Sequence, residues 1–258
     1  MSADRASHIE AQRAFYESRE HRHLRPQGED AYAEKLASEL ARRSGIEPHH
    51  RVLEVGAGFG RFTFPLLRRC GSIVALDSSR RVLESLELGR DDRGIPGSRC
   101  ETWCANLDDA ELARGREPFD FVVGFFILHH LPDLRRALAN LRPLLGDRGR
   151  MAFLEPNRRN LLFLAQVACC PDMGWSEEKG LFRLSAASVA NACRAAGIQP
   201  EGDEQLGFFP PQLYNRFAWC RRLESRLERR RWLAPILPFL LLRAGLSPEA
   251  SNPVSPAQ

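Results

Sequence analysis

Residues 52–62, with the sequence VLEVGAGFGRF, determine how the rest of the chain is interpreted. The apolar residues at its start are typical of a buried strand, and Phe62 and Leu66 then follow at helical spacing. Between them stand three glycines at alternate positions, Gly56, Gly58 and Gly60. Glycine adopts positive φ easily and lets a ligand approach main-chain N–H groups, so the stretch predicts a strand, a cofactor-binding turn and a helix.

The spacing of these glycines distinguishes between cofactors. The dinucleotide fingerprint G-x-G-x-x-G needs a third glycine at position 61, where this chain has Arg61. Glu54 stands at the mouth of the strand, where its carboxylate would repel a pyrophosphate and attract the amino group of a methionine moiety. The stretch resembles motif I of the class I S-adenosylmethionine-dependent methyltransferases. The resemblance implies that Glu54, the glycines and Ala57 contact S-adenosylmethionine; a tight turn without a ligand is the alternative.

The resemblance implies an α/β fold, a Rossmann-like, doubly wound and mostly parallel sheet. A chain of 258 residues is long enough for one such core with a lid. The expected parts are an N-terminal helical lid (1–45), the S-adenosylmethionine-binding methyltransferase domain (46–209), a helical C-terminal extension (210–248) and a disordered tail (249–258).

Composition restricts the possible partners. The net charge is +4, and Lys35 and Lys179 are the only lysines, an arginine excess that favours a high-GC genome over nucleic-acid binding. The seven cysteines and the polar first residues predict a reducing, cytoplasmic location. Neither Cys100 with Cys104 nor the pair 169–170 has zinc-site spacing, so no metal is expected.

Two helices are predicted before the first strand. One is centred near Tyr16, and the second is marked by Tyr32, Leu36 and Leu40. In the family that the chain resembles, such a segment covers the cofactor. The resemblance therefore implies that Tyr16, His21 and His23 reach the substrate, and the alternative is a solvated helix with a packed tyrosine.

A second predicted strand, residues 72–77 (SIVALD), ends in an acid. A carboxylate here matches the two ribose hydroxyls of a bound nucleoside, so Asp77, with Ser78 beside it, is assigned to the cofactor. The alternative for Asp77 is stabilisation of the following helix N-terminus. After a third strand at 99–104, the resemblance places Asn106 and Leu107 beside the adenine, although the family's usual acid is absent.

Residues 119–133, FDFVVGFFILHHLPD, predict the central strand of the sheet, because the run is apolar on both faces. Phe125 falls at its carboxyl end, beside the cofactor, and Phe126 faces the substrate. The family's Asn-Pro-Pro-Tyr-like run for planar nitrogen acceptors is missing. His129 and His130 follow, and one of them is expected to accept the substrate's proton; the alternative is that one caps the next helix.

A helix over 134–145 and a strand over 151–154 lead to Glu155. At the carboxyl end of its strand, Glu155 is expected to assist the base or bind a substrate group, or else to pair with Arg158 or Arg159. Asn157 extends the same rim and is assigned to the substrate.

The C-terminal third predicts a helix over 185–196 and a sixth strand over 198–209 that ends in Phe208 and Phe209 at the substrate site. No seventh strand is evident beyond it. An arginine-rich helix precedes the apolar run 233–242, which is too short to cross a bilayer. That run is expected to pack on its own domain, to cover the substrate pocket or to contact a membrane surface.

These features together predict methyl transfer to O, N or C of a small, mostly apolar molecule. The alternatives are a methyltransferase of RNA or protein, and a binding module without catalysis. The sequence leaves the acceptor and the oligomeric state open.

Overall fold

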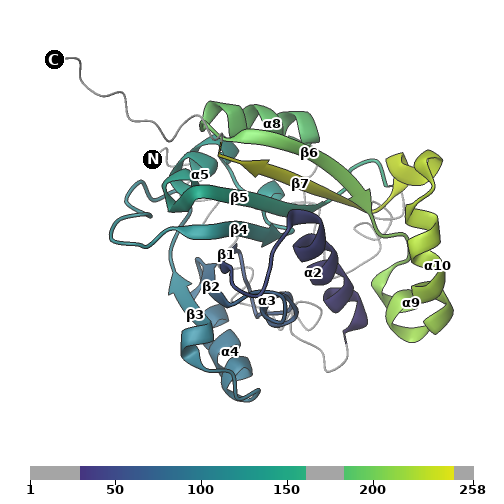
Figure 1. Cartoon of the computed structure of the whole chain (residues 1–258), viewed down its shortest axis with the longest axis horizontal. Helices are drawn as coiled ribbons and strands as arrows, with labels where there is room; N and C mark the ends of the chain where they lie inside the picture. Colours follow the sequence, from purple (N-terminus) through teal and green to yellow (C-terminus); the bar gives the residue numbers. More distant parts are fainter. Residues whose placement is uncertain (1–29, 161–182, 247–258) are drawn as a thin grey trace.

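The computed structural model describes residues 30–160 and 183–246, which form a seven-stranded sheet with the strand order β3-β2-β1-β4-β5-β7-β6 (Figure 1). The strands are β1 (Arg51–Val55), β2 (Ser72–Asp77), β3 (Cys100–Cys104), β4 (Phe119–Phe125), β5 (Leu145–Pro156), β6 (Gln199–Leu206) and β7 (Phe239–Gly245). Neighbouring strands from β3 to β5 run parallel, and β7 runs antiparallel to both of its neighbours.

The described helices lie between and beside these strands. The α-helices are α2 (Ala31–Ser44), α3 (Thr63–Leu67), α4 (Arg80–Asp91), α5 (Leu134–Leu141), α8 (Ala186–Ala195), α9 (Pro211–Arg216) and α10 (Ala218–Glu228). Short 3₁₀ turns are η1 (Gly97–Arg99), η2 (Leu128–His130), η3 (Arg142–Leu144) and η4 (Arg231–Ile236). Side chains of Asp30, Ser79, Asp133 and Ser185 cap the helices that follow them, which explains where these helices begin.

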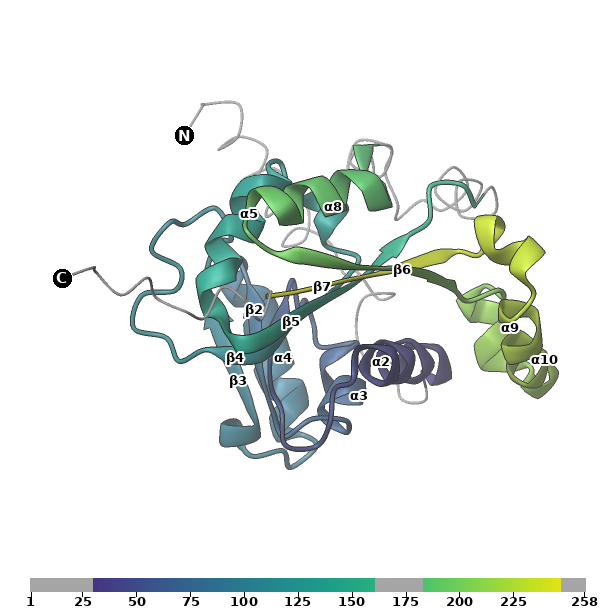
Figure 2. The ribbon, with the colours of Figure 1, turned by 45° about the horizontal axis from the view of Figure 1, so that its top comes forward.

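The sheet is covered on both faces, and its strands alternate between two cores. Val52 of β1 packs in the core beneath α2, α3 and α4, whereas Leu53 faces the core beneath α5 and α8. Figure 2 shows α5 and α8 on one side of the sheet, with α2 and α3 on the other. This arrangement explains why the strand sequences are apolar at successive positions.

The C-terminal segment contains the strand that the sequence analysis missed. β7 lies between β5 and β6, where Phe239 is paired with Pro156 on one side and Leu206 on the other. The expectation of a helical extension through residue 248 is therefore wrong for 239–245. Leu241 is fully buried, so this part of the apolar run belongs to the core and not to a membrane contact or a lid.

The helices α9 and α10 project from the end of the molecule to which β6 leads (Figure 1). Lys35 of α2 donates to the carboxylates of Glu224 and Glu228 on α10. These carboxylates also accept the N–H groups of Phe209 and Gly207, which follow β6. Lys35 thus links α2 to α10 and, through the two carboxylates, to the end of β6.

The first predicted helix and the tail at 249–258 lie outside the described residues. The second predicted helix is α2, whose apolar face, including Leu36 and Leu40, is buried against the sheet.

Candidate functional site

The glycine loop lies between β1 and α3, at the edge where the parallel strands end. Gly56, Gly58 and Gly60 all have positive φ, of 69°, 56° and 83°. A Cβ at Gly56 would lie 2.6 Å from Ile127, and one at Gly60 would lie 2.9 Å from Phe64. At Gly58 a Cβ would meet no atom of the described residues within 4 Å. The outer glycines are therefore required by the chain's own packing, whereas Gly58 faces open space in which a ligand can lie.

Strand order places this loop at a binding crevice. β1 pairs with β2 on one side and with β4 on the other, so successive connections leave the sheet in opposite directions here. Ligands of open α/β sheets bind at such a switch point, outside the carboxyl ends of the strands.

Glu54 lies buried directly before the loop. Its side chain is close to Thr63 at the start of α3, but neither Glu54 Oε2 nor Thr63 Oγ1 has a hydrogen-bond partner among the described residues. Burial raises the pKa of Glu54 to about 8, and the charge of Asp77 adds to this rise. A buried acceptor of this kind fits a cationic amine, which would restore the charged carboxylate.

Asp77 ends β2 and contacts the loop directly. Its carboxylate accepts the N–H of Gly58 at 3.0 Å through Oδ2 and the N–H of Ser79 at 3.0 Å through Oδ1. Burial raises the pKa of Asp77, and these N–H groups act in the opposite direction. A carboxylate offers about four acceptor positions, so two hydrogen bonds leave capacity for a diol. The role at the start of α4 and the predicted ribose role are therefore compatible, and Ser78 beside it is exposed.

Beyond β3, the loop assigned to adenine is ordered by local hydrogen bonds. Asn106 Oδ1 accepts the N–H of Asp108 at 2.9 Å, and the Leu107 carbonyl accepts from Asn140 at 2.8 Å. Leu107 is buried in the core beneath α5. Asp108, which the sequence analysis did not single out, is buried, and its Oδ2 has no partner in the described part of the chain. The adenine assignments stay predictions, with Asp108 as an additional candidate.

Aromatic side chains line the edge beyond the glycine loop. The rings of Phe62 and Phe125 are stacked with centroids 4.4 Å apart, and Phe126 contacts Phe62 edge-on at 5.6 Å. Phe125 is buried, whereas Phe62 and Phe126 are partly exposed. Phe126 has a φ of 58°, and no other described residue except glycine has a positive φ. The strained backbone directs an aromatic ring to the end of the central strand.

The structure brings Glu155 together with His129. Glu155 Oε2 lies 2.6 Å from His129 Nδ1, and Oε1 accepts the N–H groups of Ile127 and Leu128 at 2.9 and 2.7 Å. Glu155 is fully buried and His129 nearly so. The predicted assistance by Glu155 therefore has a geometric basis, and the alternative ion pair with Arg158 or Arg159 is not formed.

The two histidines differ in their surroundings. Their rings lie 4.0 Å apart, but His130 is partly exposed. Asp133, and not a histidine, caps α5. Because Glu155 binds Nδ1 of His129, it favours the tautomer in which Nε2 accepts a proton.

Three residues assigned to the substrate contribute to the packing of the C-terminal segment. Asn157 donates to the carbonyls of Pro235 and Leu237 at 3.1 and 2.8 Å, so its amide connects β5 to η4. Phe209 is buried beside Trp219, and Phe208 contacts Phe209 at 5.1 Å. Their substrate roles stay predictions. Tyr16, His21 and His23 lie outside the described residues.

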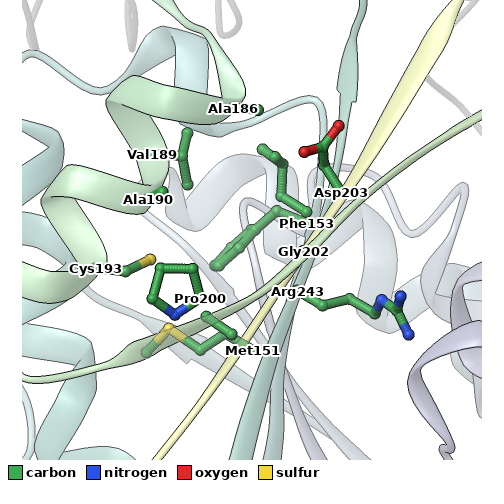
Figure 3. Close-up of a pocket in the computed structure, with 12 residues that line it drawn as sticks. Met151, Phe153, Ala186, Val189, Ala190, Cys193, Pro200, Gly202, Asp203 and Arg243 are labelled. Atoms are coloured by element: carbon green, nitrogen blue, oxygen red, sulfur yellow. The ribbon is translucent and has the colours of Figure 1, made fainter.

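A separate apolar recess lies between α8 and strands β5, β7 and β6 (Figure 3). It adjoins the β-bulge between Pro200 and Gly202, and its lining includes Met151, Val189 and Cys193. About 60 Å³ of it is open to water-sized molecules, well below the roughly 300 Å³ of small-molecule sites. This recess is too small to be the binding site.

Within residues 30–160 and 183–246, no group of histidine, cysteine and acidic side chains is arranged to hold a metal ion. The five cysteines of this part of the chain are all free thiols. None of its helices combines the length and apolar character needed to cross a bilayer.

Comparison with known sequences supports the assignment of the loop. Residues 53–151 match the family model described as "Methyltransferase domain". An uncharacterized methyltransferase of Mycobacterium tuberculosis is 32% identical over 123 residues, which cover 46% of this chain and 59% of that protein. A highly reducing polyketide synthase of Preussia isomera is 27% identical over 153 residues, which cover 50% of this chain and 5% of the synthase.

Solved structures share the fold. A SAM-dependent methyltransferase from Aquifex aeolicus has a TM-score of 0.56 at 14% identity, with 86% of this chain and all of that chain covered. The 4+2 cyclase SpnF has a TM-score of 0.59 at 17% identity, with 83% and 81% covered. The predicted Rossmann-like α/β fold is confirmed. The chain contains a class I S-adenosylmethionine-dependent methyltransferase domain, as its glycine loop predicted, and S-adenosylmethionine is the cofactor that this domain implies.

Proposed function

We propose that this protein transfers a methyl group from S-adenosylmethionine to O, N or C of a small, mostly apolar molecule. The observation that carries the proposal is the open space at Gly58, bounded by the buried carboxylate of Glu54 and the partly buried carboxylate of Asp77 at the switch point of the sheet. When bound, the cofactor supplies a methyl group on a positively charged sulfur.

The residues around the glycine loop would bind different parts of the cofactor. Glu54, protonated near neutral pH when alone, ionises beside a cationic amino group. Asp77 accepts from ribose hydroxyls while it holds the Gly58 N–H at 3.0 Å. Asn106, Leu107 and Asp108 border the adenine end.

We assign proton acceptance to His129 rather than His130. The contact of 2.6 Å with Glu155 orients the His129 ring and favours a positive charge on it. Glu155 is the positioning residue, because its other oxygen holds the turn that carries the histidine. Most of the rate gain would come from orientation of the acceptor and exclusion of water.

The partly exposed rings of Phe62 and Phe126 support an apolar acceptor, because they form a wall at the carboxyl end of β4. The similarity to polyketide synthases points in the same direction, toward an acyl-chain-like acceptor. We also propose a cytoplasmic location, which the free thiols of the described residues support.

The structural similarity to SpnF gives a specific reason to test the reaction itself, since that protein is named as a cyclase. A shared fold does not decide the chemistry. A cofactor-binding protein without methyl transfer would bind S-adenosylmethionine and release no methylated product.

Calorimetry with S-adenosylmethionine and NAD tests the binding site. Gly58→Val should reduce affinity for S-adenosylmethionine at least about 100-fold, because the side chain would fill the ligand's space. Gly94→Val is the matched control, since Gly94 has a φ of 63° and also has open space around its Cβ. Binding of NAD in place of S-adenosylmethionine by the wild-type protein would refute the assignment.

Transfer of a tritiated methyl group to apolar acceptors, including acyl thioesters, tests the reaction. His129→Ala should lower kcat about 10²-fold or more, the usual contribution of a general base, with cofactor affinity retained. Glu155→Gln should shift the pH profile of kcat. If His130→Ala lowers kcat while His129→Ala does not, the assignment of the base is wrong.

A further inference from the structure

The helices beyond β6 carry an unusual concentration of exposed apolar side chains. Among the described residues, the large apolar side chains classed as exposed are Leu88 and six in the C-terminal segment: Leu213, Phe217, Trp219, Leu223, Trp232 and Ile236. Trp232 is 75% exposed and Trp219 55% exposed. We call α9, α10 and η4 with these side chains the C-terminal face.

The same face is strongly basic. Its exposed arginines are Arg216, Arg221, Arg222, Arg226, Arg229 and Arg230. The only acidic residues between 211 and 236 are Glu224 and Glu228, and both carboxylates face inward to Lys35. The negative charges of this segment are thus withdrawn from the surface, and the positive charges remain on it.

The two kinds of side chain share one side of α10. Trp219 and Leu223 are one helical turn apart, and Arg222 and Arg226 lie along the same stripe. The opposite stripe, with Cys220 and Glu224, is buried. No carboxylate of the described residues pairs with Arg222 or Arg226, whereas the exposed Arg42 and Arg114 pair with nearby glutamates.

We propose that the C-terminal face binds the surface of a membrane that contains anionic lipids. Arginines free of acidic neighbours are complementary to lipid phosphates, and tryptophan and aliphatic side chains among them enter the boundary between headgroups and acyl chains. A nucleic acid would use the arginines and the aromatic rings but not the exposed Leu213, Leu223 and Ile236.

The position of the face suits this role. In Figure 1, α9 and α10 lie beyond the strand ends on the side toward which β4 and β6 point. Tyr32 connects the two regions, because its ring contacts Tyr214 of α9 at 5.2 Å and Phe239 of β7 at 6.1 Å. Docking here brings the carboxyl edge of the sheet near the lipid surface, independently of which reaction occurs there.

Co-sedimentation with vesicles tests the proposal on the full chain. The protein should bind vesicles of phosphatidylcholine with about 30% of the anionic lipid phosphatidylglycerol at least about tenfold more tightly than vesicles of phosphatidylcholine alone. Binding should weaken as salt increases, because screening shortens the range of the charges.

Variants separate the contributions of charge and apolar contact. The double variant Arg222→Glu with Arg226→Glu, and the double variant Trp219→Ala with Trp232→Ala, should each weaken vesicle binding about tenfold or more. Arg114→Glu and Leu88→Ala, at exposed positions outside the face, should not change it. Circular dichroism and calorimetric S-adenosylmethionine binding should be unchanged in all of them.

Three results would overturn the proposal. Equal, salt-independent binding to both vesicle types would exclude an anionic lipid. Tighter binding of a single-stranded oligonucleotide, lost in the same variants, would assign the face to nucleic acid. Sedimentation of a dimer that the tryptophan variants dissociate would assign it to self-association.

Discussion

Two regions of the molecule bury carboxylates in opposite ways. Beside the glycine loop, Glu54 is buried without a cation, and its pKa rises to about 8. At the junction of α2 and α10, the buried Glu224 and the partly buried Glu228 both pair with Lys35 and accept backbone N–H groups as well. An uncompensated buried carboxylate costs stability and is explained by a ligand, whereas a compensated one holds helices together.

Lys35→Met should have the largest effect on stability. It leaves buried Glu224 without a cation and Glu228 with Arg43 alone, 3.9 Å away, so the free energy of unfolding at pH 7 should fall by about 3–5 kcal/mol in urea titrations. Burial already raises the pKa of Glu224. The loss should therefore diminish as pH falls and Glu224 becomes protonated, because the neutral carboxyl needs no cation. Glu111→Gln, at the exposed pair with Arg114, is the control and should cost less than about 1 kcal/mol.

Leu241→Ala compares the late strand with the early part of the sheet. Leu241 of β7 and Leu53 of β1 are both fully buried, so each Leu→Ala change should cost about 2–5 kcal/mol. Urea unfolding of both variants measures this. A cost below about 1 kcal/mol for Leu241→Ala alone would mean that β7 is only loosely attached to the sheet.

Glu54→Gln tests the carboxylate that has no cation. The folded state binds the proton of Glu54 up to about pH 8, whereas the unfolded chain releases it near its ordinary value. Stability of the free protein should therefore fall as pH rises through this window, by about 2–3 kcal/mol between pH 6 and pH 8. The variant should lose that slope and bind S-adenosylmethionine more weakly. If the unfolding free energies of the wild type and the variant change with pH in the same way, the titration of Glu54 does not cause the pH dependence of stability.

Phe126 provides the smallest test, at the backbone of the aromatic wall. Phe126 has a φ of 58°, a left-handed conformation that glycine adopts more easily than alanine. The Phe126→Gly variant should therefore be more stable than Phe126→Ala by about 1 kcal/mol, the reverse of the usual order within regular structure. Thermal unfolding of the two variants gives the difference directly. If alanine is the more stable residue, the backbone does not hold the left-handed conformation in solution.

Local sequence was sufficient for the first half of the sheet. The segments β1, β2 and β4 were predicted because each is a short apolar run followed by a loop signal, and parallel strands of this kind keep the order set by their connections. The run 233–242 was misjudged because Pro235 and Pro238 interrupt it. Pro235 lies inside η4 and Pro238 precedes β7, so the prolines end a turn and leave the strand intact.

The sequence by itself determined the glycine loop, the cofactor that fits it and the candidate residues Asp77, His129, His130 and Glu155, because these depend on residue type and short-range spacing. Only the tertiary structure decided which histidine meets Glu155, since that contact joins residues 26 positions apart through the pairing of β4 with β5. It likewise decided that Leu241 is core while Trp219 and Trp232 are surface. Burial is set by what packs against a side chain, and β5, β6 and α2 come from distant parts of the chain.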